Sequence, residues 1–423
     1  MPAETSTQQL IARRNRLLGP AYRLFYEQPV HVVRGEGIWL YDAAGKRYLD
    51  AYNNVACVGH CHPRVIEAIA RQAAVLNTHT RYLHETILDY AERLLATFPA
   101  EIGQVMFTCT GSEANDLALR VARTCTSGTG VIVTRTAYHG VTGALAELSP
   151  SLGLPEPTAP HVRLVPAPQS AGDETGEIFA NHVRTAFADM ARNGIRPAAL
   201  LVDTIFSSDG VFADPPGFLR PAVEAAHAAG ALFIADEVQP GFGRCGQGLW
   251  GFARHGIVPD MVTMGKPMGN GHPIAAMAAR PDLLREFGAR SRYFNTFGGN
   301  PVSAAAGMAV LDVIEREGLV ENAGRTGALL RQRLDALRAR HELVAEVRGA
   351  GLFIGVELRH GGAPAGQQAA RIVNALRETG VLISAAGPGG NVLKIRPPLV
   401  FGAEHVDLLV DALDQALLEN SPG

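Results

Sequence analysis

Residues 218–238, FLRPAVEAAHAAGALFIADEV, contain the pattern that decides the fold. The first part spaces its apolar residues as one face of a helix does, and a glycine separates it from an apolar run that ends at Asp236. Short apolar runs alternate with helical patterns from about residue 62 to residue 300: QVMFTC (104–109), GVIVT (130–134), AALLVDT (198–204) and DMVTMG (260–265). This alternation predicts a doubly wound, mostly parallel α/β sheet.

The segments on either side show different patterns. Residues 1–55 combine a helical start with alternating strands around the turn DAAGK (42–46), and residues 306–423 mix long helices with short strands such as VLKIRPPLV (392–400). We expect a large domain over residues 56–305 and a smaller α+β domain over residues 306–423, with the N-terminal segment packed against the smaller domain.

The composition limits the classes of function. The chain has 423 residues, 47% of them hydrophobic, and a formal net charge of −3, so neither nucleic acid nor an anionic membrane is an expected partner. The start, MPAETSTQQL, lacks the basic and apolar regions of a signal peptide, and no apolar run approaches the roughly 20 residues of a membrane span. Five cysteines suit reduced thiols better than a disulfide framework, which predicts a cytoplasmic location.

Two motifs suggest sites that their context does not support. CVGHCHP (57–63) places cysteines beside histidines, but a structural zinc site takes a second ligand pair from a separate segment, so a turn leading into a helix after Pro63 is expected. GFGRCG (241–246) matches a dinucleotide-binding pattern, yet the following QGLWGFARHG is a poor start for the helix that such a site requires. We predict neither a metal nor a dinucleotide.

Two features of the expected sheet suit an anionic ligand with a cationic ring. Asp236 ends a buried strand at the edge where open α/β sheets bind ligands, and a carboxylate buried there needs a cationic partner such as a protonated pyridine. Gly111 and Ser112 follow another strand and open a helix, whose first N–H groups suit a phosphate. The plainer alternative at each place is a residue that only caps a helix or a turn.

The lysines narrow the chemistry further. Of the 38 basic residues only Lys46, Lys266 and Lys394 are lysine, and Lys266 is the one in the α/β region, where glycines flank it. A lysine desolvated beside a buried strand has a lowered pKa and becomes a nucleophile for carbonyl groups. A lysine able to form a Schiff base, an acid for a ring nitrogen and a phosphate cradle together describe a site for pyridoxal 5′-phosphate.

Five motifs follow one another along the chain: TGSEAND (110–116), AYHG (137–140), ADEVQPGFGR (235–244), MGKPMGNG (264–271) and FNTFGGNP (294–301). Their sequences and order resemble those of the class III aminotransferases, which are pyridoxal-phosphate enzymes of fold type I, from about residue 20 to the C-terminus. Within that family, VTMGKPMGNGHP and VLKIRPP are most similar to the phospho-lyases that cleave ethanolamine phosphate or phosphohydroxylysine.

The resemblance implies roles for the residues that match the family's cofactor contacts. Lys266 would form the Schiff base, and Asp236 would hold the pyridine nitrogen. Val238 would pack under the ring and Gln239 would lie near its phenolic oxygen. Tyr138 would stack on the cofactor.

The resemblance also implies how the cofactor phosphate is held. Gly111 and Ser112 match the phosphate loop, and Thr296 matches a residue that reaches the phosphate from the other subunit. The family is therefore expected to form an obligate homodimer with its active sites at the interface.

Two positions differ from the amino-acid transaminases. Those enzymes commonly carry an arginine three residues before Pro-Pro that binds the substrate α-carboxylate, where this chain has Lys394. Many also carry a glutamate that shields this arginine, and the aligned residue here is Ser208. Lysine lacks the planar geometry with which arginine binds a carboxylate, and a glutamate would repel a dianion. The resemblance and these differences together predict a site for a substrate phosphate.

The predicted phosphate site is formed by Lys394, with Arg23, Asn53 or Asn54 as further contacts. Arg396 either shares this anion or pairs with an acid. The predicted reaction is elimination of phosphate from O-phosphoethanolamine to give acetaldehyde, ammonia and inorganic phosphate, with phosphohydroxylysine open as another substrate. The alternatives are transamination from an ω-amine or amino acid to a 2-oxo acid, and a cofactor-binding regulatory protein without turnover.

Overall fold

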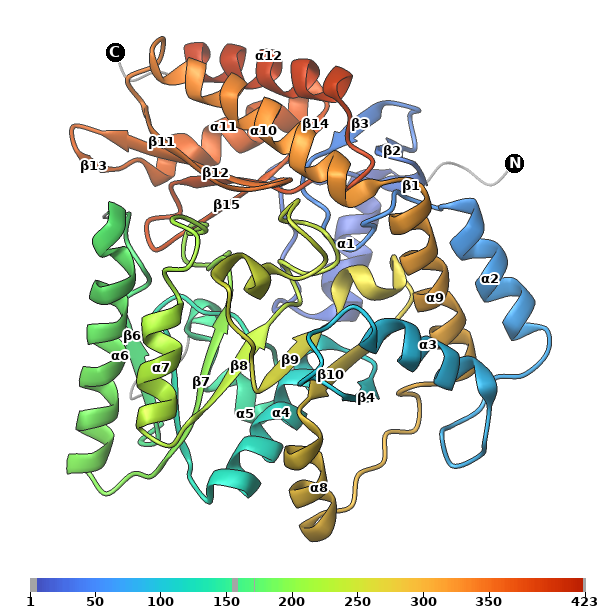
Figure 1. The fold of residues 1–423 in the computed structure, drawn as a ribbon. Coiled ribbons are helices and arrows are strands. Elements are labelled where there is room, and N and C mark those ends of the chain that lie inside the picture. Colours follow the sequence, from blue (N-terminus) through green and yellow to red (C-terminus); the bar gives the residue numbers. More distant parts are fainter. Residues whose placement is uncertain (1–5, 154–158, 171, 421–423) are drawn as a thin grey trace.

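The computed structural model describes residues 6–153, 159–170 and 172–420 (Figure 1). Its largest sheet has seven strands in the order β4-β10-β9-β8-β7-β5-β6. The pairs from β6 to β9 are parallel, and β10 runs antiparallel to both of its neighbours. The predicted fold class is therefore confirmed. The strands are β4 (Gln104–Thr108), β5 (Gly130–Thr134), β6 (Val162–Val165), β7 (Pro197–Asp203), β8 (Leu232–Asp236), β9 (Met261–Met264) and β10 (Ala275–Ala279).

Helices cover both faces of this sheet because the central strands are apolar on both faces. Leu200 and Phe233 belong to the core cluster of α6 and α7, whereas their neighbours Leu201 and Ile234 belong to the cluster of α4 and α8, as the two-residue period of a strand requires. The stretch 218–238 forms α7 and β8, as its pattern predicts. The four helices are α4 (Gly111–Thr126), α6 (Thr175–Arg192), α7 (Arg220–Ala228) and α8 (Pro281–Arg290).

The C-terminal part forms a second sheet, in the order β11-β12-β16-β15, with β13 paired to β12. Three helices lie over this sheet at the top of Figure 1. Its elements are α10 (Leu319–Arg338), β11 (Val344–Ala350), β12 (Phe353–His360), β13 (Ala363–Pro364), α11 (Gly366–Thr379), β15 (Ser384–Ala386), β16 (Val392–Ile395) and α12 (Ala403–Glu419).

A third sheet joins the two ends of the chain. Its order is β1-β2-β3-β14, and the C-terminal strand β14 pairs in parallel with the N-terminal strand β3. The predicted turn DAAGK connects the antiparallel strands β2 and β3. These strands are β1 (Val32–Glu36), β2 (Trp39–Asp42), β3 (Arg47–Asp50) and β14 (Val381–Leu382). The other helices are α1 (Thr7–Leu18), α2 (Pro63–Ala73), α3 (Glu85–Leu95), α5 (Gly143–Ala146) and α9 (Pro301–Arg316), with short 3₁₀ turns η1 (Pro150–Leu152), η2 (Gly172–Glu174), η3 (Gly251–His255) and η4 (Lys266–Gly269).

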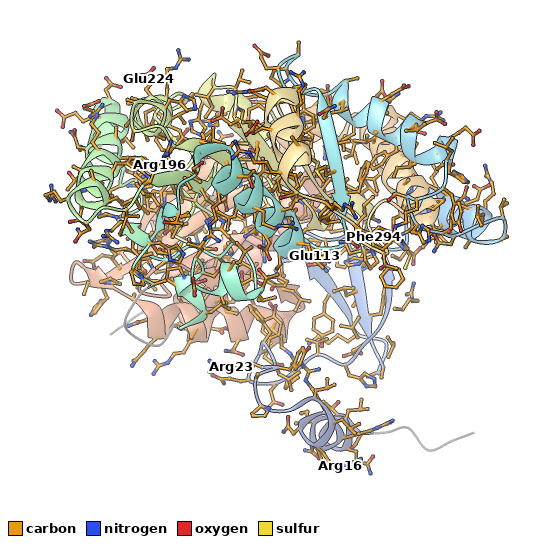
Figure 2. The ribbon with its side chains drawn as sticks, turned by 90° about the horizontal axis from the view of Figure 1, so that it is seen from below. Arg16, Arg23, Glu113, Arg196, Glu224 and Phe294 are labelled. Carbon is orange, nitrogen blue, oxygen red and sulfur yellow. The ribbon has the colours of Figure 1, made fainter. Side chains whose placement is uncertain are left out.

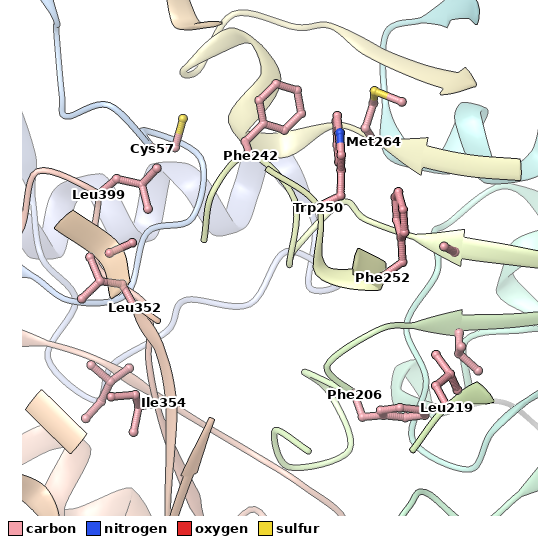
Figure 3. Close-up of a cluster of buried hydrophobic side chains, with 14 of the residues drawn as sticks. Cys57, Phe206, Leu219, Phe242, Trp250, Phe252, Met264, Leu352, Ile354 and Leu399 are labelled. Atoms are coloured by element: carbon pink, nitrogen blue, oxygen red, sulfur yellow. The ribbon is translucent and has the colours of Figure 1, made fainter. Parts of the chain in front are cut away.

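One hydrophobic core connects the large sheet to the C-terminal sheet (Figure 3). Leu352 and Ile354 from the C-terminal part belong to the same buried cluster as Phe242, Trp250 and Phe252. This shared core fixes β16, which carries Lys394, relative to the carboxyl edge of the large sheet.

The two motifs that resemble a zinc site and a dinucleotide site form turns that connect helices and strands. CVGHCHP runs through a turn into α2, and GFGRCG leads into turns and η3 without starting an α-helix. Among the described residues, no group of three or more His, Cys, Asp or Glu side chains could hold a metal ion. No helix in the same ranges is long and apolar enough to cross a membrane.

Candidate active site

One pocket at the carboxyl edge of the large sheet collects residues from several elements. Asp203 and Asp236 are the last residues of the paired strands β7 and β8, and Lys266 follows β9. Parallel strands end at the same edge, so side chains distant in sequence meet there. Of the eight residues predicted to contact the cofactor, all but Thr296 line this pocket. Its lining is Gly111, Ser112, Asn115, Tyr138, His139, Gly140, Asp203, Asp236, Val238, Gln239 and Lys266.

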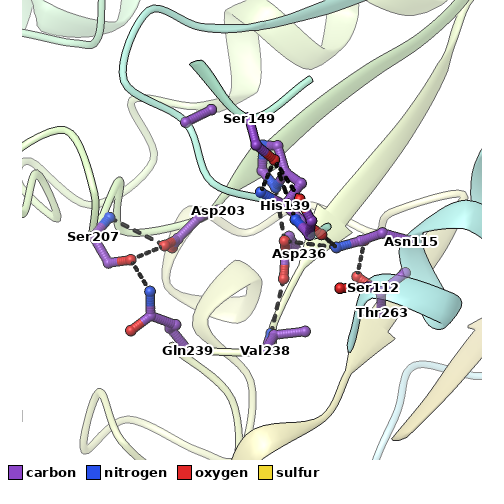
Figure 4. Close-up of polar contacts among 12 residues, drawn as sticks. Ser112, Asn115, His139, Ser149, Asp203, Ser207, Asp236, Val238, Gln239 and Thr263 are labelled. Atoms are coloured by element: carbon purple, nitrogen blue, oxygen red, sulfur yellow. Dashed lines mark hydrogen bonds and ion pairs between the residues drawn. The ribbon is translucent and has the colours of Figure 1, made fainter. Parts of the chain in front are cut away.

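Asp236 is a buried carboxylate held by three donors (Figure 4). Its Oδ2 lies 2.7 Å from His139 Nδ1 and accepts from Asn115 Nδ2 at 2.9 Å, while Oδ1 accepts from the Val238 N–H at 3.1 Å. Burial raises the pKa of Asp236, but His139 and the other two donors outweigh burial, so the net pKa lies below its ordinary value. The carboxylate is therefore ionised and suited to a protonated ring nitrogen.

Two residues that hold Asp236 have no assigned role in the sequence-based prediction. Asn115 also donates to the His139 carbonyl at 2.9 Å, and its Oδ1 accepts from Thr263 Oγ1 at 2.6 Å, so its amide nitrogen faces Asp236. Asn115 and His139 lie within the motifs TGSEAND and AYHG, and this position in a motif was the available signal. Thr263 lies in the strand part of the motif VTMGKPMGNGHP, where the apolar pattern marks it only as a strand residue.

Lys266 lies at the start of η4, directly after β9. Its Nζ is 5.9 Å from the centre of the Tyr138 ring and has no hydrogen-bond partner among the described residues. Burial lowers the pKa of Lys266, and Arg396 lowers it further, against the opposing charge of Asp236. An unpaired amine with a lowered pKa is suited to attack a carbonyl group and to accept a proton.

The N-terminus of α4 offers an anion site beside Lys266. Thr110 caps this helix, accepting from the Glu113 N–H at 3.1 Å, which leaves the N–H groups of Gly111 and Ser112 for a ligand. Ser112 Oγ accepts from the Val141 N–H at 3.1 Å. A Cβ built on Gly140, whose φ is +146°, would lie 2.6 Å from Ser112 Oγ, so the loop after Tyr138 approaches α4 closely because glycine stands there.

Lys394 and Arg396 are buried together on the side of the C-terminal sheet. Lys394 Nζ donates to the Ser207 carbonyl at 3.3 Å, and Arg396 Nη1 donates to Gln239 Oε1. The Arg396 guanidinium lies 4.8 Å from the centre of the Tyr52 ring, and its buried Nε has no hydrogen-bond partner in the part of the chain that the structure describes. Within the described ranges, neither cation has a carboxylate oxygen within 4.0 Å.

The electrostatics of this pair favour an anionic ligand. Burial, followed by the positive charge of Arg396, lowers the pKa of Lys394 to about 7. Burial also lowers the pKa of Arg396. An anion bound between Lys394 and Arg396 would compensate their charges and so raise both pKa values towards their ordinary values.

The other residues predicted to contact the substrate phosphate are Arg23, Asn53 and Asn54, and none of them has a described contact with Lys394 or Arg396. Arg23 is exposed on the N-terminal segment near α1 (Figure 2), and its described contacts do not include Lys394 or Arg396. Asn53 Oδ1 accepts from the Val55 N–H at 2.9 Å, so this side chain closes its own turn. Asn54 is buried and donates to the Gln239 carbonyl at 3.0 Å, which places it beside the pocket. Their contacts with a substrate stay predictions.

Ser208 and Thr296 lie outside the pocket lining. The Ser208 carbonyl accepts from the Gly387 N–H at 3.2 Å, and Ser208 is partly exposed. Thr296 is exposed, and its predicted contact with the cofactor of another subunit stays a prediction.

The residues present fit pyridoxal 5′-phosphate. Asp236 provides an ionised acceptor for the ring nitrogen, and the start of α4 with Ser112 provides phosphate donors. Lys266 provides the free amine between them. The fold and this site together define a pyridoxal-phosphate-dependent enzyme of fold type I.

The chain belongs to the class III aminotransferase family, whose model, described as "Aminotransferase class-III", matches residues 25–417. Its cofactor is pyridoxal 5′-phosphate. The chain is 38% identical to "Alanine--glyoxylate aminotransferase 2-like" from Drosophila melanogaster, over 96% of this chain and 86% of the relative. It is 36% identical to "Ethanolamine-phosphate phospho-lyase homolog 1" from Caenorhabditis elegans, over 97% of this chain and 94% of the relative.

A solved structure shares both the sequence and the fold. It is a phospholyase from Arthrobacter in complex with phosphoethanolamine, and it is 45% identical with a TM-score of 0.94. The match covers 97% of this chain and 99% of that one. The comparisons thus include relatives named as aminotransferases and relatives named as phospho-lyases.

Proposed function

We propose that this enzyme is a phospho-lyase that removes phosphate from O-phosphoethanolamine. One observation carries the proposal: Lys394 and Arg396 are buried, Arg396 contacts the pocket residue Gln239, and the partners of both cations are neutral oxygens. Two positive charges without a direct carboxylate partner among the described residues suit a phosphate dianion better than a carboxylate with a single charge. The similarity to a phospholyase in complex with phosphoethanolamine and to a phospho-lyase homolog supports the proposal.

The proposed chemistry divides the work between the cofactor and four residues. Pyridoxal phosphate, when bound, supplies an electron sink for negative charge on the carbon that bears the substrate nitrogen. Lys266 removes the proton from that carbon as a general base, and Asp236 keeps the ring nitrogen protonated. Lys394, with Arg396, stabilises the charge that develops on the departing phosphate, a contribution of about 3–4 kcal/mol per well-placed donor.

The reaction balances with water as the other reactant. Loss of the proton from one carbon and of phosphate from its neighbour breaks a C–H and a C–O bond and leaves an unsaturated amine. Hydrolysis by one water molecule then gives acetaldehyde and ammonia beside inorganic phosphate. No 2-oxo acid is consumed.

Transamination is the second candidate because a relative with 38% identity is named as an alanine–glyoxylate aminotransferase. In that reaction a 2-oxo acid accepts the amino group, and the substrate anion is a carboxylate. Lys394 and Ser208 argue against it, since they replace the arginine and glutamate that serve carboxylate substrates in the amino-acid transaminases.

We further propose a cytoplasmic homodimer in which Thr296 of the partner subunit reaches the cofactor phosphate. The five cysteines are free, which suits a reducing compartment. The exposed side chains of Tyr82, Leu83 and Phe294 line one surface pocket, and Thr296 and the exposed Phe297 follow Phe294 in the sequence. Figure 2 shows Phe294 near Glu113 of α4, to which Asn295 donates at 3.1 Å. Exposed apolar side chains gathered in this way are typical of an interface.

The test is release of inorganic phosphate from phosphoethanolamine by the holoenzyme without any 2-oxo acid. We expect catalytic release of phosphate together with an equal amount of acetaldehyde. Turnover that starts only when pyruvate or glyoxylate is added, with phosphate still bound to carbon, would instead identify a transaminase.

A further inference from the structure

A hydrogen-bond chain leads from Arg396 through Gln239 and Ser207 to Asp203. Arg396 Nη1 donates to Gln239 Oε1, and Gln239 Nε2 donates to Ser207 Oγ at 2.7 Å. Ser207 Oγ in turn donates to Asp203 Oδ2, and Figure 4 shows the part from Gln239 to Asp203. Arg396, Gln239 and Ser207 are all buried, and Ser207 has no exposed surface.

The chemistry of the two ends fixes the direction of every bond in this chain. A guanidinium can only donate, so the group facing Arg396 has to be the carbonyl oxygen of Gln239. Both oxygens of Asp203 accept from backbone N–H groups, Oδ1 from Ile205 and Oδ2 from Ser207, so the Ser207 hydroxyl gives its proton to Asp203 and accepts from Gln239. Ser207 therefore decides which end of the Gln239 amide meets Arg396.

Ser207 also provides the partner of the second cation. Its carbonyl oxygen accepts from Lys394 Nζ at 3.3 Å, and its N–H donates to Asp203 Oδ2 at 3.1 Å. Asp203 thus anchors Ser207, and Ser207 holds Lys394 directly and Arg396 through Gln239. Both cations are positioned by dipoles, and no carboxylate oxygen of the described residues lies within 4.0 Å of either.

We propose that Ser207 and Gln239 determine specificity by holding Lys394 and Arg396 with uncharged oxygens, so that the pocket selects a dianionic phosphate over a carboxylate. The inference rests on the proposed function. A glutamate at position 239 would have nearly the same shape but would neutralise Arg396. Repulsion scales with ligand charge, so such a glutamate would weaken binding of a dianion more than of a monoanion.

The experiment measures binding of inorganic phosphate and of acetate to the holoenzyme at pH 8 by calorimetry. Because the pKa of Lys394 is about 7 without ligand, we expect Lys394 to take up a proton when the anion binds. For Gln239→Glu we expect phosphate affinity to fall by about 30-fold and acetate affinity by about fivefold, because the repulsion energy doubles with the charge. Gln247→Glu is the matched control, since Gln247 is exposed and accepts from Arg254 at 2.6 Å outside the pocket. The control should change neither affinity by more than about twofold.

A second variant tests whether Ser207 acts through Gln239. Ser207→Ala removes the acceptor that orients the amide, and we expect phosphate affinity to fall by about fivefold. In the Gln239→Glu background the same change should have little effect, because either carboxylate oxygen can meet Arg396 and orientation no longer matters. Ser207 does not line the cofactor pocket, so we expect Ser207→Ala to keep the cofactor. This variant therefore still tests the inference if Gln239→Glu loses the cofactor.

The outcomes separate the inference from the proposed function. If the unaltered holoenzyme binds phosphate but Gln239→Glu keeps the same ratio of phosphate to acetate affinity, the inference is wrong and the proposed function stands. Equal effects of Ser207→Ala in both backgrounds would also overturn it. If the unaltered holoenzyme neither binds phosphate nor releases it from phosphoethanolamine, the proposed function fails, and the inference with it.

Discussion

At the scale of single residues, Lys266 is the one lysine in the cofactor pocket. Lys266→Ala removes both the amine for the cofactor and the general base, so we expect phosphate release from phosphoethanolamine to slow by about 10³-fold. Lys46→Ala is a matched control, because Lys46 is exposed and donates only to the Glu378 carbonyl. Near-normal turnover by Lys266→Ala, with an unchanged thermal midpoint, would exclude a catalytic role.

Lys394 makes substrate capture depend on pH. Its pKa is about 7 in the absence of ligand, below its ordinary value, so Lys394 loses its positive charge as the pH rises through this value. We expect kcat/KM for phosphoethanolamine to fall above pH ~7, because this ratio reports the protonation of the free enzyme. The substrate phosphate, with a second pKa of about 6, is already a dianion there and does not cause the fall.

The variant Lys394→Arg shows whether the fall in kcat/KM above pH ~7 comes from titration of Lys394 or of Lys266. Arginine keeps its charge throughout the range, so the fall assigned to Lys394 should disappear in the variant even if the maximal rate is lower. A profile measured by phosphate release from pH 6 to pH 9 makes the comparison. If the fall persists unchanged in Lys394→Arg, another group is responsible.

At the scale of elements, the approach of the loop after Tyr138 to the start of α4 shapes the phosphate end of the pocket. In Gly140→Ala the new methyl group would meet Ser112 Oγ at 2.6 Å and the Leu145 side chain at 2.7 Å. We expect the Kd of the apoenzyme for pyridoxal phosphate to rise about tenfold or more, from strain of roughly 1–3 kcal/mol. A titration followed by cofactor absorbance measures this change.

Gly143→Ala is the control for this loop, because a Cβ there has no neighbour within 4 Å. Gly143 is the first residue of α5, three positions after Gly140. The control should keep the cofactor affinity of the unaltered chain. Equal affinity in both variants would show that the close approach at Gly140 is unimportant for the cofactor.

The end of β16 is a second element that shapes the site. The strand stops at Ile395 because the prolines at 397 and 398 cannot donate to a sheet, and the Arg396 N–H donates to the Ala51 carbonyl at 2.9 Å. Arg244, fully buried, donates to the Pro397 carbonyl. The two cations are therefore carried by a strand end that contacts with Ala51 and Arg244 hold in place.

At the scale of the whole molecule, the surface around Leu83 is expected to be covered by a second copy. Leu83 is 98% exposed in the single chain, so Leu83→Glu costs the isolated subunit little stability. We expect this variant to dissociate into monomers at micromolar concentration in sedimentation velocity and to bind the cofactor less tightly, as Thr296 of the partner subunit is lost. Leu418→Glu on α12, where Leu418 is 56% exposed, should remain a dimer.

A different outcome for Leu83→Glu would show that the surface around Leu83 does not hold the subunits together, or that the dimer does not complete the cofactor site. If Leu83→Glu sediments as the unaltered chain does, this surface is not the interface between subunits. Unchanged cofactor affinity in a monomeric variant would show that Thr296 does not complete the site.

The sequence by itself determined the α/β class, the cofactor and most residues that line its pocket. Asp236, Lys266 and Gly111 lie at ends of strands or helices, and such ends are local features that apolar periodicity and glycines mark. Parallel strands then bring these ends to one edge, whatever the details of packing. Short-range patterns were therefore sufficient for Asp236, Lys266 and Gly111, whereas Tyr138, Val238 and Gln239 were predicted from the resemblance to the family.

Only the tertiary structure decided which polar groups pair in the interior. Arg396 meets Gln239 across 157 residues, and Thr263 meets Asn115 across 148 residues. Neither contact follows from periodicity, because a pattern assigns a face to a side chain but not the partner on the opposing element. The partner depends on how two sheets and their shared core pack, and that packing leaves Lys394 and Arg396 beside neutral oxygens.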